Sequence, residues 1–151
     1  TNLSEGRGTT HPFEIMGAPW IDADVLARRL AACGLPGVRF RPLTFRPTFH
    51  KYAGQSCGGV HLHVLDRKRF RPFLTGVELI RCVRELWPRE FGWRTEAYEF
   101  ETDRPAIDLL AGGPWLREVA EGKRDLESCR SAWQREIKEF RKVRRKYLLY
   151  D

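Results

Sequence analysis

The sequence predicts an α+β fold, with a small mixed or antiparallel sheet flanked by several helices. Three observations support this: two segments have strand-like patterns, several have helical spacing, and the C-terminal segment reads as one long amphipathic helix. The 151 residues contain no internal repeat and no low-complexity linker, so we expect one domain over 1–151. With 42% hydrophobic and 31% charged residues, and no apolar run near the roughly 18 residues of a membrane span, the chain falls in the globular class.

The first expected helix begins after Asp22, whose side chain suits an N-cap, and ends at Gly34 and Pro36. Its buried positions are Leu26, Leu30 and Cys33. A strand over 38–45 follows, in which arginines alternate with apolar residues. Pro42 and Pro47 restrict this strand to a sheet edge or an irregular course, because proline cannot donate to a ladder.

The second expected strand has the alternation of a half-buried strand. Its apolar face carries Val60, Leu62 and Val64, and its other face carries His61 and His63. Two imidazoles on one face are compatible with a metal site, but no carboxylate lies at a diagnostic spacing, so we expect no metal there. We interpret His61 and His63 instead as residues that line a polar cleft.

The second helix is expected to open with a capping box, Thr75-Gly-Val-Glu78, and to end at Pro88. Its apolar stripe comprises Leu79, Ile80, Val83, Leu86 and Trp87. Two short helices follow, one beginning at Asp103 and Pro105 and the other at Pro114. Each ends at a glycine.

The last helix is predicted to start at Asp125 and to lie along the body of the domain with one buried seam. The seam positions are Leu126, Cys129, Trp133, Ile137, Phe140, Val143 and Tyr147. Many lysines and arginines lie on the other face, and the whole chain carries a formal charge of +7. Nucleic-acid binding would need cations interleaved with aromatics, whereas here Glu136 and Glu139 interrupt the run, so we expect no nucleic-acid partner.

Four cysteines occur without any C-x-x-C pair, which argues against a zinc knuckle or a thioredoxin-like motif. Cys33, Cys82 and Cys129 fall on helical patterns where small apolar residues belong, so buried thiols are the simplest interpretation. Two disulfides in an oxidising compartment remain possible on count alone.

The first fourteen residues are dense in potential ligands. Glycines at positions 6 and 8 allow sharp turns, Glu5 and Glu14 are candidate acid or base carboxylates, and Arg7 offers a planar fork for an anion. Two interpretations stay open, a mobile terminus or part of a site. The loop over 48–59, with Thr48-Phe-His-Lys-Tyr52 followed by Gly54 and Gly58-Gly59, joins the two strands and is also rich in donors.

Several motifs recur here in a familiar order. They are Ser4-Glu-Gly-Arg-Gly-Thr9, His11-Pro-Phe-Glu14, Gly17-Ala-Pro-Trp20, Pro36-Gly-Val-Arg-Phe40, Pro47-Thr-Phe49, Lys51-Tyr52 and Cys57-Gly-Gly-Val60. With this set of motifs the chain resembles, over essentially its whole length, the exo-β-N-acetylmuramidase family of bacterial cell-wall turnover, long catalogued as a domain of unknown function.

The resemblance implies that the chain is the C-terminal, cleft-forming half of a two-domain glycosidase whose Rossmann-like N-terminal catalytic half is absent. The implied activity is exolytic removal of N-acetylmuramic acid from peptidoglycan fragments, with no cofactor. Glu5 is the candidate catalytic residue, either as one of the two carboxyl groups or as a side chain that orients a catalytic group of the absent half. Arg7 is the candidate residue to bind the lactyl carboxylate. The candidate substrate-binding residues are Asn2, Ser4, Arg7, Thr9, His50, Lys51, Tyr52, His61 and His63.

The resemblance also implies two partners, peptidoglycan-derived saccharides and the N-terminal half of the same protein. Cell-wall substrates suggest a periplasmic or extracellular location, with the cytoplasm as the alternative. Because the principal acid is expected upstream, this chain alone should bind weakly without turnover. The competing hypothesis is a non-catalytic peptidoglycan-binding or scaffolding module, with a nucleic-acid binder that uses the basic helix as a more distant one.

Overall fold

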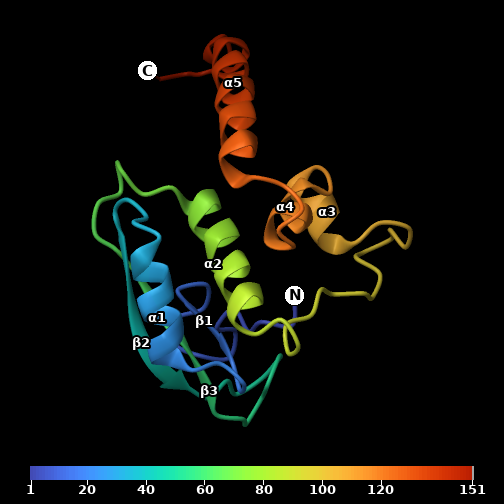
Figure 1. Cartoon of the computed structure of the whole chain (residues 1–151). Helices are drawn as coiled ribbons and strands as arrows, with labels where there is room; N and C mark the ends of the chain where they lie inside the picture. Colours follow the sequence, from blue (N-terminus) through green and yellow to red (C-terminus); the bar gives the residue numbers. More distant parts are fainter. Residues whose placement is uncertain (151) are drawn as a thin grey trace.

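The computed structural model describes residues 1–150, which form three strands and five helices in an α+β arrangement (Figure 1). The strands are β1 (Ile15–Ala18), β2 (Val38–Phe45) and β3 (Cys57–Val64). The helices are α1 (Ala23–Ala32), α2 (Pro72–Leu86), α3 (Ala106–Ala111), α4 (Trp115–Ala120) and α5 (Leu126–Arg145). The predicted fold class and the long C-terminal helix are confirmed.

The sheet is antiparallel, with the strand order β1-β3-β2. β2 lies at an edge, as its prolines predicted, and Pro42 pairs with Val60 of the central strand. β1 was not predicted, because its four residues, Ile-Met-Gly-Ala, show neither alternation nor a β-branched run. Pairing with β3 therefore creates this strand, rather than local propensity.

The central strand β3 begins at Cys57, so Gly58 and Gly59 lie inside the strand rather than in the preceding loop as expected. Both glycines are paired on two sides, and Gly59 faces Gly17 of β1 across the ladder. Glycine is needed here because the neighbouring backbone lies very close: a Cβ on Gly59 would collide with the carbonyl oxygen of Met16.

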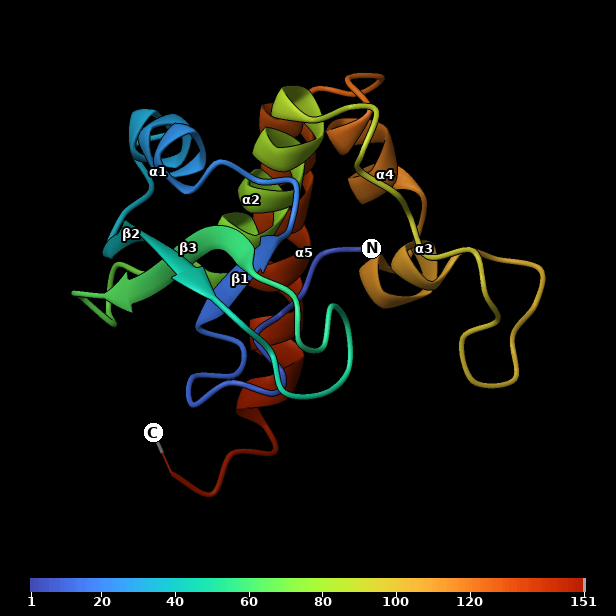
Figure 2. The same ribbon diagram turned by 90° about the horizontal axis from the view of Figure 1, so that it is seen from below.

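α1 and α2 cover one face of the sheet and close the main core (Figure 2). Asp22 caps α1 as predicted, and its side chain accepts a hydrogen bond of 2.9 Å from the Val25 N–H. The buried core residues from the two helices and β3 include Leu26, Leu30, Val60, Leu79, Cys82 and Val83. The apolar face predicted for the second strand is therefore confirmed at Val60, whereas Val64, at the strand's end, is exposed.

The predicted capping box at Thr75 is wrong. α2 begins one turn earlier at Pro72, which suits a first helical position because the missing N–H would be unpaired there. Thr75 is therefore inside the helix, and its hydroxyl donates a hydrogen bond of 2.9 Å to the Arg71 carbonyl oxygen. Glu78 pairs with Arg81 instead of capping a terminus.

The predicted buried seam of α5 is also wrong beyond its second turn. Cys129 is buried and Trp133 packs against Trp115, in a second core that joins α2, α4 and the start of α5. Further along, the helix extends away from the sheet (Figure 1), and the remaining seam residues are exposed. These residues are Ile137, Phe140, Val143 and Tyr147. The physical reason is that the second core reaches only Leu126, Cys129 and Trp133 of α5, so the later turns have no apolar partner among residues 1–150.

The four cysteines are free thiols; Cys82 and Cys129 are buried, as predicted, and Cys57 is buried as well. The predicted burial of Cys33 is wrong: this residue is the C-cap of α1, at the edge of the main core, and it is only half-buried. Burial raises the pKa of Cys57 above its ordinary value, so this thiol is not an activated nucleophile. Burial, together with the adjacent Cys33 thiol, raises the pKa of Cys82 to about 12. No helix among residues 1–150 combines the length and apolar character that crossing a bilayer requires.

Candidate active site

Two loops that are distant in sequence meet at the Glu5 carboxylate. One loop precedes β1, and the other connects β2 to β3. The Lys51 ammonium donates hydrogen bonds of 3.0 Å to Glu5 Oε2 and 2.9 Å to the Leu3 carbonyl oxygen. The first residues of the chain are thereby fastened to the body of the domain, which favours the site interpretation over a mobile terminus.

Two further basic side chains approach the other oxygen of the same carboxylate. Arg7 Nε lies 3.2 Å from Glu5 Oε1, and His50 Nδ1 lies 3.9 Å from it. The Arg7 guanidinium also stacks over the Phe13 ring at 5.4 Å. Half of the Arg7 side chain is exposed, and its Nη atoms have no hydrogen-bond partner among residues 1–150, so they can bind an incoming anion.

The surroundings of Glu5 favour its ionised form. Burial alone would raise the pKa of Glu5, but the hydrogen bonds from Lys51 and from its own backbone, with the charges of Lys51 and His50, outweigh burial. The pKa of Glu5 therefore lies below its ordinary value of 4.5. At neutral pH this group is a carboxylate, which suits a base, a nucleophile or an electrostatic stabiliser and not a proton donor.

A hollow of about 340 Å³ lies beside the carboxylate, and Glu5, Arg7, His50 and Lys51 all line it. Its other residues are Thr1, Arg94, Tyr98, Ala106, Ile107 and Leu110. The chain start lies next to α3 in Figure 2, which places this helix in the wall of the hollow. Arg94 and Tyr98 were not predicted as site residues. The one signal in the sequence was the pair Trp93-Arg94, which lies in a polar segment without a strand pattern.

The backbone around the hollow is strained at non-glycine residues. Phe13, His50 and Tyr52 have φ values of 67°, 70° and 59°, in the left-handed region that side chains with a Cβ rarely adopt. Such strain is kept where the surrounding structure fixes a functional geometry. Tyr52 lines an adjacent hollow of about 490 Å³, which shares His50, Lys51 and Arg94 with the first.

Three predicted substrate-binding residues use their side chains to hold the loops. The Asn2 amide donates to the Glu90 carbonyl oxygen (2.7 Å) and accepts from the Gly92 N–H (2.9 Å). Ser4 is buried, and its hydroxyl accepts a hydrogen bond from the Gly6 N–H at 3.3 Å. The Thr9 hydroxyl donates to the Gly6 carbonyl oxygen at 2.6 Å. These groups shape the loop that presents Glu5 and Arg7.

His61 and His63 form a separate cluster on the sheet face opposite α1 and α2. Their rings lie 4.1 Å apart, and Glu14 Oε2 lies 3.3 Å from His61 Nε2. Burial, with the neighbouring His61 and Arg41, lowers the pKa of His63, so its imidazole is neutral. His63 lines a different hollow, of about 740 Å³, next to the start of α2. The structure therefore brings His50 and Lys51 to Glu5, places Tyr52 in the adjacent hollow, and keeps His61 and His63 apart from both.

The depressed pKa of Glu5 makes a pH-dependent contribution to stability. The contribution is present above about pH 4.5 and is lost as the pH falls through the lower pKa of the folded state. We expect Lys51→Met to lower the free energy of unfolding at pH 7, and the difference from the wild type to shrink below pH 4.5. Part of the stability difference should persist at acid pH, because Lys51 also donates a hydrogen bond to the Leu3 carbonyl oxygen.

Urea unfolding of the 151-residue chain across this pH range measures the effect. Lys138→Met, on the exposed face of α5, serves as the control and should shift stability equally at every pH. A penalty for Lys51→Met that did not change with pH would contradict the coupling between Lys51 and Glu5.

Comparison with known proteins confirms the family expected from the motifs. The chain is 39% identical over 150 residues to the peptidoglycan beta-N-acetylmuramidase NamZ of Bacillus subtilis (strain 168). The aligned region covers 99% of this chain and 34% of that protein. It matches the crystal structure of a DUF1343 family protein from Bacteroides fragilis NCTC 9343 with a TM-score of 0.80 and 27% identity, over 99% of this chain and 38% of that one. The chain thus spans only 34% and 38% of these proteins' lengths. Residues 1–150 match the family model described as "Exo-beta-N-acetylmuramidase NamZ, C-terminal", and the chain therefore belongs to this family of C-terminal domains.

Proposed function

We propose that this chain forms one wall of the cleft of an exo-acting β-N-acetylmuramidase, which removes terminal N-acetylmuramic acid from peptidoglycan fragments. The rest of the cleft, including a proton-donating acid, would belong to a Rossmann-like N-terminal half of the parent protein. Family membership supports the proposal, as does the relative from Bacillus subtilis, which is named a peptidoglycan beta-N-acetylmuramidase. A cell-wall substrate would be met by the parent in the periplasm or outside the cell, which is the location that we propose.

The observation that carries the proposal is an ionised Glu5 at the edge of an open, cation-lined hollow. Cleavage of a glycosidic bond passes through a transition state that resembles an oxocarbenium ion, and two carboxyl groups of opposite protonation state ordinarily share the work. The depressed pKa fits Glu5 to the anionic role. The N-terminal half would then supply the protonated partner, and this chain alone would bind fragments without turnover.

The cations around Glu5 suggest how the substrate is chosen. Muramic acid differs from glucosamine by a lactyl ether that ends in a carboxylate. Arg7 is anchored by its Nε to Glu5, and its half-exposed guanidinium suits bidentate pairing with such a carboxylate. Lys51 adds positive charge to the same hollow, which His50 also lines, and would strengthen the attraction for this anion.

A non-catalytic peptidoglycan-binding module is the second candidate function. It is favoured by one specific observation: three cationic or protonatable groups surround a single carboxylate. Such a hollow could bind an anionic saccharide without cleaving a glycosidic bond. The two functions differ in the expected role of Glu5. In a binding module its removal would leave catalysis by the parent unchanged.

Arg7→Met in the full-length parent tests the substrate assignment. We expect kcat/KM for a chromogenic β-N-acetylmuramide to fall by about 10- to 100-fold, the effect of losing hydrogen bonds to a charged group. The value for the matching β-N-acetylglucosaminide, which lacks the lactyl carboxylate, should change much less. The ratio of the two values is the measurement, since any disturbance of Glu5 affects both substrates alike.

Arg130→Met is the matched control, because Arg130 is exposed to a similar extent and pairs with a glutamate on α5. It should leave both substrates unaffected. An equal loss on the two substrates for Arg7→Met would show that Arg7 supports Glu5 without reading the lactyl group. A parent that hydrolyses neither substrate would overturn the proposed function itself.

A further inference from the structure

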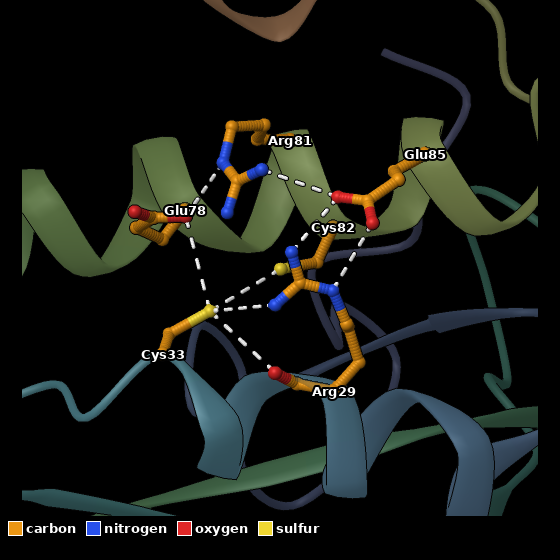
Figure 3. Close-up of polar contacts among 6 residues, drawn as sticks. All are labelled: Arg29, Cys33, Glu78, Arg81, Cys82 and Glu85. Atoms are coloured by element: carbon orange, nitrogen blue, oxygen red, sulfur yellow. Dashed lines mark hydrogen bonds and ion pairs between the residues drawn. The ribbon is translucent and has the colours of Figure 1, made fainter.

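A second polar cluster lies between α1 and α2 (Figure 3), and none of its residues lines the Glu5 hollow. It contains Cys33 at the C-terminal end of α1, and Cys82 and Glu78 on α2. Cys33 Sγ lies 3.6 Å from Cys82 Sγ and 3.9 Å from Glu78 Oε2. The three ligand atoms all lie within 4.8 Å of one another.

The spacing of these atoms is that of ligands around one tetrahedral ion. Two Zn–S bonds of about 2.3 Å at a tetrahedral angle hold their sulfurs about 3.8 Å apart. Glu78 and Cys82 are four residues apart on one helix and therefore project from the same face, toward Cys33. We propose that Cys33, Cys82 and Glu78 bind one Zn²⁺ ion, with water in the fourth position.

The charges around the cluster fit a divalent cation bound by two thiolates. With Zn²⁺ present, Cys33, Cys82, Glu78 and Glu85 contribute four negative charges. The ion, Arg29 and Arg81 contribute four positive charges. On binding, the two thiol protons pass to solvent and no oxidation state changes. The assembly is electrically neutral both with the ion and, as neutral thiols, without it.

The two arginines also occupy the places of outer-shell donors. Arg29 Nη1 donates to Cys33 Sγ at 3.3 Å, and Arg81 Nε donates to Glu78 Oε2 at 2.8 Å. Glu85 fixes both guanidinium groups, accepting from Arg29 Nη2 at 2.9 Å and from Arg81 Nη1 at 3.1 Å. Donors of this kind orient metal ligands and are commonly part of a metal site.

The third ligand distinguishes this cluster from a cysteine pair that is set to form a disulfide. A disulfide is uncharged and requires neither a carboxylate nor guanidinium donors beside it, whereas Glu78 is mostly buried and directed at the thiols. Cys33 is half-buried, which leaves the ion a route from solvent to an otherwise enclosed position. Bound there, the ion would link α1 to α2, the two helices over the sheet.

Co²⁺ titration of the reduced, chelator-stripped full-length parent tests the site. We expect one Co²⁺ per chain, with a near-ultraviolet thiolate charge-transfer band and the visible bands of tetrahedral Co²⁺, and displacement of both by Zn²⁺. Cys33→Ser and Cys82→Ser should lose the thiolate band. Glu78→Gln should keep the band but weaken Co²⁺ binding by at least tenfold. Cys129→Ser, which changes a buried thiol outside the cluster, should behave as the wild type.

Because Cys82 is fully buried and its variant can fail to fold, the half-buried Cys33 gives the deciding variant. Zn²⁺ should raise the melting temperature of the wild type and not that of Cys33→Ser. A folded, reduced protein without the thiolate band would overturn the proposal. So would a Cys33–Cys82 disulfide in the isolated protein whose reduced form gives no band. Neither the Co²⁺ bands nor the melting temperature depends on glycoside hydrolysis, so these experiments test the metal site independently of the proposed function.

Discussion

Replacing Glu5 by Gln in the full-length parent is expected to lower kcat for a chromogenic β-N-acetylmuramide by about 10²- to 10⁴-fold, the range for loss of a group that acts on the reacting atoms. The amide keeps the size of the side chain and can still bond to Lys51, but it carries no charge. Because the missing charge matters most when positive charge develops on the sugar ring, KM should change far less than kcat.

Glu118→Gln is the matched control for this experiment. Glu118 has a similar exposed fraction to Glu5, 30% against 25%, and pairs with Arg124 at 3.1 Å, but it lies on α4 outside the hollow. It should leave kcat unchanged. A folded Glu5→Gln parent with undiminished kcat would remove Glu5 from the catalytic machinery and favour the binding-module function.

Elements defined by local signals could be predicted from the sequence. Asp22 and Gly34 fix the ends of α1 through capping and a left-handed backbone at the C-terminal side, both of which are local effects. The edge position of β2 followed in the same way from Pro42, which cannot donate to a ladder. In these cases the determinant lies within a few residues of the feature.

Features that depend on a distant partner could not be predicted. β1 exists because β3 lies beside it, and its residues show no strand pattern of their own. The apolar spacing of α5 correctly predicted a helix, but burial of its far turns depends on how far the second core extends along it, which spacing does not reveal. The first turn of α2 was missed because Thr75 and Glu78 mimic a cap, whereas Pro72 sets the start.

The candidate site was predictable in its residue types and only partly in its geometry. Glycine-flanked Glu5 and Arg7, and the donor-rich loop with His50 and Lys51, were identified separately, and the fold brings them together. His61 and His63 were grouped with them because they are polar, but strand periodicity turns them onto the sheet face. Polarity alone does not show whether a side chain serves a ligand or, as with Ser4, the loop's own backbone.

Replacing a crowded glycine and an uncrowded glycine by alanine should change the free energy of unfolding in opposite directions. Gly59→Ala in the central strand is expected to lower the free energy of unfolding by more than about 3 kcal/mol, or to prevent folding, because overpacking and backbone displacement act together. The new Cβ would overlap the Met16 carbonyl oxygen and approach Gly17 Cα of the same paired strand, and both are backbone atoms that cannot rotate away. β1 would therefore have to separate from β3, and with it the loop that carries Glu5.

Gly76→Ala is the control and should stabilise the chain by about 0.5–1 kcal/mol. Gly76 lies within α2, where a Cβ meets no heavy atom within 4 Å, so alanine adds helix propensity and restricts the unfolded chain at no steric cost. Urea unfolding of the two variants, with circular dichroism to detect loss of the fold, measures both effects. Similar stability for Gly59→Ala and the wild type would mean that β1 can move away from β3 at little cost, in which case the antiparallel pairing would not be what holds the Glu5 loop in place.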